Sequence, residues 1–135
     1  GFCHIHTSIE KENVEKARKL HPEALVLAHP ECTWDVLETA DYIGSTSGII
    51  DFATKSDADV FIICTEMGVL YELELKNPNK KFYSVGHRQF CPSMKRITPE
   101  NLLEQLKTMH NVVELNEEMY RNANRALERM LTMSE

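Results

Sequence analysis

The sequence has no tract of basic residues and no interleaving of aromatic with arginine side chains, and its formal net charge is −6. Clustered positive charge is what holds nucleic acids, so we expect no nucleic-acid partner. No apolar run approaches the roughly 18 residues of a membrane span, so we expect no membrane association. The chain does not open on a basic segment followed by an apolar one. We therefore see no signal peptide and expect a cytoplasmic location.

The sequence has no CxxC pair, and its four cysteines, Cys3, Cys32, Cys64 and Cys91, lie far apart. A zinc ribbon is therefore unsupported. A disulfide framework is the weaker interpretation, because 135 residues with 42% hydrophobic content can build an ordinary core. Metal ligands, cluster ligands and packed thiols stay open, although Cys64 ends the most apolar run and is expected in the core.

Segments with strand character alternate with segments of helical spacing along the chain. The expected strands are residues 2–6, 24–28, 41–44, 60–64 and 81–85. The expected helices are residues 9–20, 33–39, 49–55, 69–76, 99–109 and 117–131. This alternation predicts an α/β fold of right-handed βαβ units on a mainly parallel sheet.

The strand at 24–28 ends in a dense polar cluster of His29, Pro30, Glu31 and Cys32. Open α/β sheets bind ligands beyond the carboxyl ends of their strands, so this cluster is a candidate site. Pro30 pushes His29 towards extended geometry. His29 and Glu31 then alternate along the backbone and can face one cavity, where one delivers and the other removes a proton. A packed histidine beside a surface glutamate is the alternative, and the residues alone leave it open.

Two further segments carry polar or thiol groups at suitable positions. Ser45, Thr46 and Ser47 lie between a strand and a helix, where free backbone N–H groups favour anions. Ordinary helix capping is the weightier explanation of these hydroxyls. Cys91 precedes Pro92, a step that occurs at iron–sulfur sites, but a lone thiol usually packs as a small hydrophobic group.

Five segments combine into a recognisable set: GFCHIH (1–6), AHPEC (28–32), IGSTS (43–47), CTEMG (64–68) and CPSMK (91–95). In this order and spacing they resemble the quinolinate synthase family, iron–sulfur enzymes of NAD biosynthesis, over essentially the whole chain. The resemblance implies condensation of iminoaspartate with dihydroxyacetone phosphate to quinolinate. It also implies a three-layer αβα sandwich that is part of a pseudo-threefold, three-domain protein, with a central [4Fe–4S] cluster that acts as a Lewis acid.

The resemblance also assigns roles to particular residues of this chain. It implies that Cys3 and Cys91 are two of the three cluster ligands and that Cys32 is not a ligand. It implies that Glu31 transfers protons at the site, next to His29. The substrate-binding set that it implies is His29, Pro30, Glu31, Ser45, Thr46 and Ser47.

Only the carboxyl-terminal half of the family is represented in this sequence. The third cluster cysteine and several substrate contacts belong to the amino-terminal half, so we expect the isolated chain to be inactive and that half to be its partner. We expect residues 1–92 to form the αβα domain that carries the site. Residues 93–135 would form a helical segment that packs back on the sheet or on the missing half. The rival hypotheses are an inert αβα interaction domain and a flavodoxin-like domain that binds anions at residues 45–47.

Overall fold

A computed structural model describes residues 3–86 and 89–134 of the chain. It divides into two compact units, Gly1–Lys95 and Arg96–Glu135, and each is described by itself. The predicted division after residue 92 stays a prediction.

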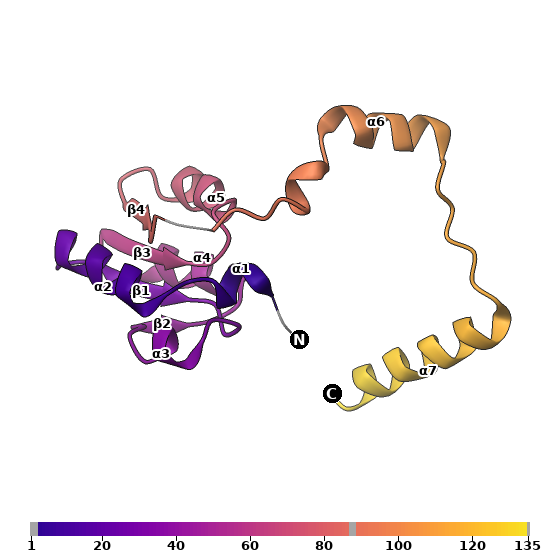
Figure 1. The fold of residues 1–135 in the computed structure, drawn as a ribbon, viewed down its shortest axis with the longest axis horizontal. Coiled ribbons are helices and arrows are strands. Elements are labelled where there is room, and N and C mark those ends of the chain that lie inside the picture. Colours follow the sequence, from indigo (N-terminus) through magenta and orange to yellow (C-terminus); the bar gives the residue numbers. More distant parts are fainter. Residues whose placement is uncertain (1–2, 87–88, 135) are drawn as a thin grey trace. The chain divides into compact units, whose positions relative to one another are not determined.

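The first unit contains a sheet of four strands in the order β2-β1-β3-β4, and every pairing is parallel (Figure 1). The strands are β1 (Leu25–Ala28), β2 (Tyr42–Ile43), β3 (Val60–Cys64) and β4 (Lys81–Ser84). In the register of the central pair, Leu27 lies opposite Ile63 and Ala28 lies opposite Cys64. The predicted α/β fold with a parallel sheet is therefore confirmed.

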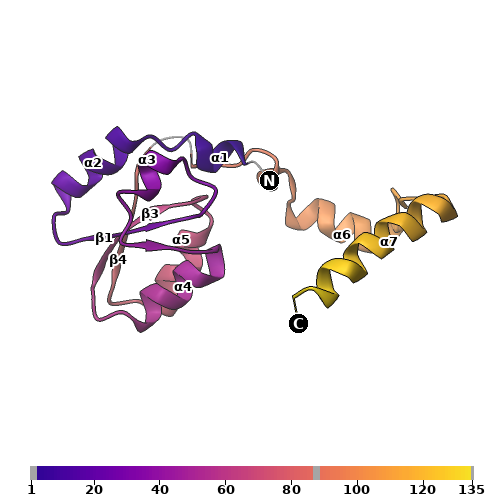
Figure 2. The same cartoon turned by 90° about the horizontal axis from the view of Figure 1, so that it is seen from below.

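Helices cover both faces of this sheet, so the unit is a three-layer sandwich (Figure 2). The helices α2 (Lys11–Leu20) and α3 (Trp34–Leu37) pack on one face. The helices α4 (Thr46–Lys55) and α5 (Val69–Lys76) pack on the other. β1 and β3 are buried on both sides, and this burial explains their continuous apolar runs.

Alternate residues of the central strands supply two separate cores, because successive strand side chains point to opposite faces. The core beneath α2 and α3 takes from the strands Val26, Ala28, Ile62 and Cys64. The core beneath α4 and α5 takes Leu27, Phe61 and Ile63. At the carboxyl edge of the sheet, the same alternation decides which side chains face α2.

The predicted strand at residues 2–6 is wrong within the described part of the chain, which begins at Cys3. The structure has a one-turn helix there, α1 (His4–Thr7), in which the Thr7 N–H donates to the Cys3 carbonyl at 3.0 Å. Ile5 and His6 are both buried. A strand would point these neighbours to opposite faces, whereas one helical turn places both against the domain.

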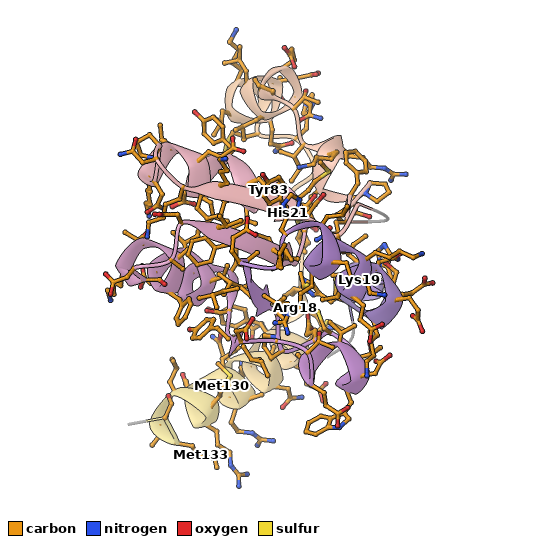
Figure 3. The ribbon with its side chains drawn as sticks, turned by 90° about the vertical axis from the view of Figure 1, so that its left-hand side faces the viewer. Arg18, Lys19, His21, Tyr83, Met130 and Met133 are labelled. Carbon is orange, nitrogen blue, oxygen red and sulfur yellow. The ribbon has the colours of Figure 1, made fainter. Side chains whose placement is uncertain are left out.

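Polar and aromatic contacts fix the edges of the sandwich. The Asp41 carboxylate accepts from the Val26 N–H at 2.7 Å and from Arg18 Nη2 at 2.5 Å, which ties the start of β2 to β1 and α2. On the other side, the ring of His21 stacks on Tyr83 of β4 with centroids 3.6 Å apart (Figure 3). Both contacts come from the end of α2, so they hold that helix across the sheet.

The second unit contains α6 (Pro99–Thr108) and α7 (Glu117–Thr132), as the sequence predicts, after a short 3₁₀ turn at Met94–Arg96. Thr98 and Asn101 form a reciprocal capping box at the start of α6, and Asn116 caps α7. Neither helix buries a residue in the structure. No helix of the described residues is long and apolar enough to cross a membrane.

Candidate functional site

The candidate site is built where three parallel strands end. His29 follows β1, Ser45 comes two residues after β2, and Thr65 follows β3. The backbone continues the sheet pattern for one more residue, since the His29 N–H donates to the Cys64 carbonyl at 3.1 Å. The carboxyl edge of the sheet therefore gathers side chains from segments far apart in sequence, as open parallel sheets do.

His6 lies at the centre of a hydrogen-bonded cluster at this edge. Its Nδ1 is 2.9 Å from Glu31 Oε2, and its Nε2 is 2.9 Å from the Thr65 hydroxyl. Its ring stacks on His29, with centroids 4.0 Å apart and planes inclined by 8°. An ionised carboxylate can only accept hydrogen bonds. A neutral His6 ring therefore donates a hydrogen bond from Nδ1 to Glu31 and accepts one at Nε2 from the Thr65 hydroxyl.

His29 and Glu31 face each other, with His29 Nδ1 3.7 Å from Glu31 Oε2. The Glu31 backbone N–H donates to His29 Nδ1 at 3.2 Å, so that nitrogen carries no proton. Burial lowers the pKa of His29, the neighbouring His6 lowers it further, and the Glu31 charge raises it in part. A neutral His29 then keeps its proton on Nε2. The pair presents one N–H donor and one carboxylate acceptor, which suits proton transfer.

The four cysteines fall into two classes by their surroundings. Cys32 and Cys64 are buried, and the Cys32 thiol donates to the Cys64 carbonyl at 3.4 Å. Burial raises the pKa of the Cys32 thiol to about 11, and burial also raises the pKa of Cys64. Cys3 and Cys91 are half-exposed. Metals bind the thiolate form, so the donor chemistry fits ligation by Cys3 and Cys91 rather than by the buried pair.

Cys3 also belongs to a group of three possible metal donors. Its sulfur, a ring nitrogen of His6 and a carboxylate oxygen of Glu31 all lie within 4.8 Å of one another. Thiolate, imidazole and carboxylate are all metal ligands in proteins. The structure therefore has a possible metal group beside the His29–Glu31 pair.

The backbone that carries Cys91 is fixed to the end of β3 by Gln89, a buried residue. Its side-chain amide donates to the carbonyls of Ile63 and Thr65, both at 2.7 Å, and accepts from the Val85 N–H at 2.8 Å. The Cys91 segment is thereby attached to the same strand end that supplies Thr65. Gln89, which begins this described segment, therefore lies at the carboxyl edge of the sheet.

The hydroxyls at residues 45–47 act in this structure as a helix cap. Ser45 Oγ accepts from the Gly48 N–H at 3.2 Å and lies 3.1 Å from Ser47 Oγ. Thr46 and Ser47 open on a hollow of about 410 Å³ that Asp51, Glu72 and Lys76 also line. Among the hydrogen bonds and ion pairs of the described residues, none joins this segment to His29 or Glu31. The substrate-binding role of Ser45, Thr46 and Ser47 stays a prediction.

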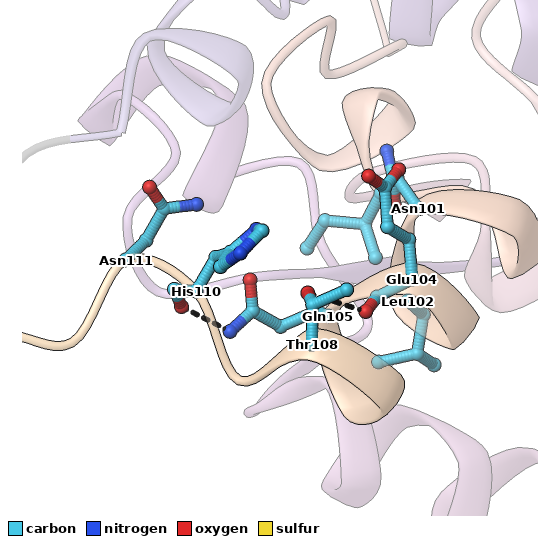
Figure 4. A pocket seen from close by; sticks show the side chains of 8 residues that line it. Asn101, Leu102, Glu104, Gln105, Thr108, His110 and Asn111 are labelled. Atoms are coloured by element: carbon cyan, nitrogen blue, oxygen red, sulfur yellow. Dashed lines mark hydrogen bonds between the residues drawn. The ribbon is translucent and has the colours of Figure 1, made fainter.

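A larger hollow lies within the second unit, along α6. Its volume is about 440 Å³, and its lining includes Asn101, Gln105, Thr108 and His110 (Figure 4). Within this lining, the Gln105 side chain donates to the His110 carbonyl (Figure 4). The lining contains none of the residues that the sequence singled out.

Sequence reasoning missed His6 and Thr65 as members of the site. The sequence placed His6 on the strand expected at residues 2–6 and gave it no role. On a helical turn, residues three apart share a face, so the spacing Cys3-x-x-His6 is the signal that indicates their proximity. Nothing in the local sequence points to Thr65, which reaches His6 across 59 positions.

Comparison with known proteins gives a consistent result. The family model described as "Quinolinate synthetase A protein" matches residues 1–132. The chain belongs to the quinolinate synthetase A family. It is 50% identical over 133 residues to the quinolinate synthase of Caldicellulosiruptor bescii, 45% over 134 to quinolinate synthase 2 of Methanosarcina acetivorans, and 44% over 134 to the quinolinate synthase of Pyrococcus horikoshii. These matches cover 98–99% of this chain but 43–44% of the relatives, so the chain spans less than half of their length.

The resemblance found in the sequence is thereby confirmed, including its restriction to part of the family's length. Within that part, His6, His29, Glu31 and Thr65 form one contact cluster, and Cys3 lies beside it. The family membership and this cluster together are the basis for the function that we propose.

Proposed function

We propose that this chain supplies the carboxyl-terminal half of a quinolinate synthase, which condenses iminoaspartate with dihydroxyacetone phosphate to form quinolinate. The observation that carries the proposal is the cluster of His29 and Glu31 beside Cys3 at the carboxyl edge of the sheet. The amino-terminal half would supply the remaining ligands and substrate contacts. The complete protein would have the pseudo-threefold, three-domain arrangement and work in the cytoplasm.

Cys3 and Cys91 would hold a [4Fe–4S] cluster together with a third cysteine from the other half. Their half-exposed thiols support this assignment, as does the contrast with the buried and protonated Cys32 and Cys64. When bound, such a cluster supplies a Lewis acid that polarises substrate oxygen.

Proton transfer would fall to the residues of this chain. Glu31 would accept a substrate proton, since its carboxylate is held by His6 on one side and is 35% exposed. His29, kept neutral by burial, would donate a hydrogen bond from its Nε2 N–H to a substrate oxygen. Pro30 would restrict the turn that joins the two residues, in which the Cys32 N–H donates to the His29 carbonyl at 3.0 Å. Thr46, with Ser45 and Ser47, would bind an anionic group of the substrate at the start of α4.

The test joins this chain to the amino-terminal half of the Caldicellulosiruptor bescii relative and reconstitutes the product anaerobically with iron and sulfide. We expect quinolinate from the joined protein and none from the isolated chain. Glu31→Gln should abolish turnover while the broad visible absorption of the cluster persists. Cys3→Ser and Cys91→Ser should each remove that absorption, and Cys32→Ala should retain it. Quinolinate formation by the isolated chain, or a cluster indifferent to both serine variants, would contradict the proposal.

A further inference from the structure

The segment after β3, Thr65-Glu66-Met67-Gly68, contains a carboxylate that the proposed function leaves without a role. The side chain of Glu66 is only 13% exposed, although it does not contact His29 or Glu31 through any hydrogen bond of the described residues. A carboxylate with so little access to water must be matched by donors of its own. The identity of those donors shows what it does.

Three donors converge on Glu66, and two of them belong to the turn that begins at Cys91. Oε2 accepts from the Gly68 N–H at 2.7 Å, and Oε1 accepts from the Cys91 N–H at 3.3 Å. The ammonium group of Lys95 lies 3.4 Å from Oε1. Lys95 in turn donates its N–H to the Cys91 carbonyl at 3.2 Å. One carboxylate therefore holds both ends of the Cys91–Lys95 turn.

Gly68 gives independent support, because it leaves space for the same carboxylate. A Cβ at this position would lie 2.6 Å from Glu66 Oε2 and 3.2 Å from Lys95 Nζ. The backbone of Gly68 has φ −60° and ψ −23°, which any residue adopts. Glycine is therefore not required by the turn itself. A side chain at this position would instead displace the ends of the Glu66 and Lys95 side chains from where they lie.

We propose that Glu66 is a positioning residue that fixes the Cys91 turn through the Cys91 N–H and Lys95, and thereby sets the direction of the Cys91 thiol. The placement of the turn follows from the contacts of Glu66. Its consequence for a cluster rests on the proposed function, in which Cys91 is a ligand.

The first test measures hydrogen exchange of the Cys91 and Lys95 amides by NMR in the metal-free chain. Hydrogen bonds to charged acceptors are the stronger ones, so Glu66→Ala should speed exchange of the Cys91 amide by about tenfold or more. Gly68→Ala should do the same without altering Glu66 itself, because it displaces the carboxylate. Glu72→Ala is the matched control, since Glu72 pairs with Lys76 on the exposed face of α5.

Exchange of the β3 amides reports whether each variant keeps the fold. If Glu66→Ala also speeds exchange of the β3 amides, the test of the proposal passes to Gly68→Ala and Glu66→Gln. Both of these variants keep a side chain of similar volume at position 66. Unchanged Cys91 exchange in every variant with an intact β3 would overturn the proposal. Faster exchange at Cys91 alone would support it.

The second test follows loss of cluster absorption after reconstitution of the joined protein. Glu66→Ala and Gly68→Ala should shorten the half-life of the cluster several-fold, while Glu72→Ala should not. Cys91→Ser serves as the reference. If Cys91→Ser leaves the cluster unchanged, the ligand assignment of the proposed function fails, while amide exchange still decides the role of Glu66. If Cys91→Ser removes the cluster and the Glu66 variants do not change its lifetime, the positioning role fails alone.

Discussion

Replacing Thr65 by valine is the most direct test of the cluster around His6. Valine has nearly the shape of threonine but lacks the hydroxyl that lies 2.9 Å from His6 Nε2. Both residues are buried, with 2% of Thr65 and 8% of His6 exposed. In the variant, water has little access to the ring nitrogen that loses its donor. We therefore expect Thr65→Val to lower the free energy of unfolding.

The size of this loss follows from the burial of His6. A buried polar atom left without its partner costs about 1–3 kcal/mol, more than the net gain of an ordinary hydrogen bond. His6→Phe removes the partner while keeping a flat ring against His29. In that background Thr65→Val should cost little, because both polar partners have been replaced together. The coupling free energy between the two positions should be about 1–2 kcal/mol.

Urea unfolding of the unchanged protein, the two single variants and the double variant, followed by far-UV circular dichroism, measures this coupling directly. Thr65→Ser is the matched control, because it keeps the hydroxyl and loses only a methyl group. Its effect on stability should be the same whether position 6 is histidine or phenylalanine. Additive effects of Thr65→Val and His6→Phe, with no coupling, would refute the hydrogen bond and with it the hold on Glu31. A coupling of the expected size would support a preorganised carboxylate at the site.

Three further predictions concern the site and the core. The imidazole of His29 should titrate below its ordinary pKa of 6.5, and Glu31→Gln should lower that pKa further by removing the one group that raises it; NMR of the ring protons checks both shifts. Because the pKa of His29 is lower in the folded than in the unfolded protein, the unfolded ring takes up a proton at a higher pH than the folded ring does. The contribution of His29 to stability is therefore complete above pH 6.5 and is lost as the pH falls through the folded pKa. In His29→Gln, the urea midpoint should change less with pH across that range. Leu73→Ala, at a fully buried position of α5, should lower the free energy of unfolding by about 2–5 kcal/mol, with an unchanged midpoint contradicting the packing of that helix.

The sequence predicted the architecture well because hydrophobic periodicity and capping are local signals. The four strands of the sheet, the alternation with helices and the capped starts of α6 and α7 all follow from residues within one turn or one strand. The failure at residues 2–6 has a physical reason. A segment of one turn shows too little periodicity to separate helix from strand, and burial of both Ile5 and His6 decided the outcome.

The candidate site was predictable only where its residues share one segment. His29 and Glu31 are two positions apart, so their proximity could be expected from the sequence. The predicted extended backbone between them is wrong, because residues 30 and 31 form a turn in which the Cys32 N–H donates to the His29 carbonyl at 3.0 Å. The hydroxyls at 45–47 show the limit of such reasoning. The same sequence supports a helix cap and an anion site, and the structure describes the cap, with Ser45 holding the Gly48 N–H.

The sequence by itself determined that this chain is an α/β domain of the quinolinate synthetase A family, with His29 and Glu31 at a strand end. Only the tertiary structure decided that His6 joins Glu31 to Thr65, across separations of 25 and 59 residues. It also decided that Glu66 holds the Cys91 turn. The physical reason is the parallel sheet. Its register brings the ends of distant strands to one edge, and nothing in a local segment records which side chains will meet there.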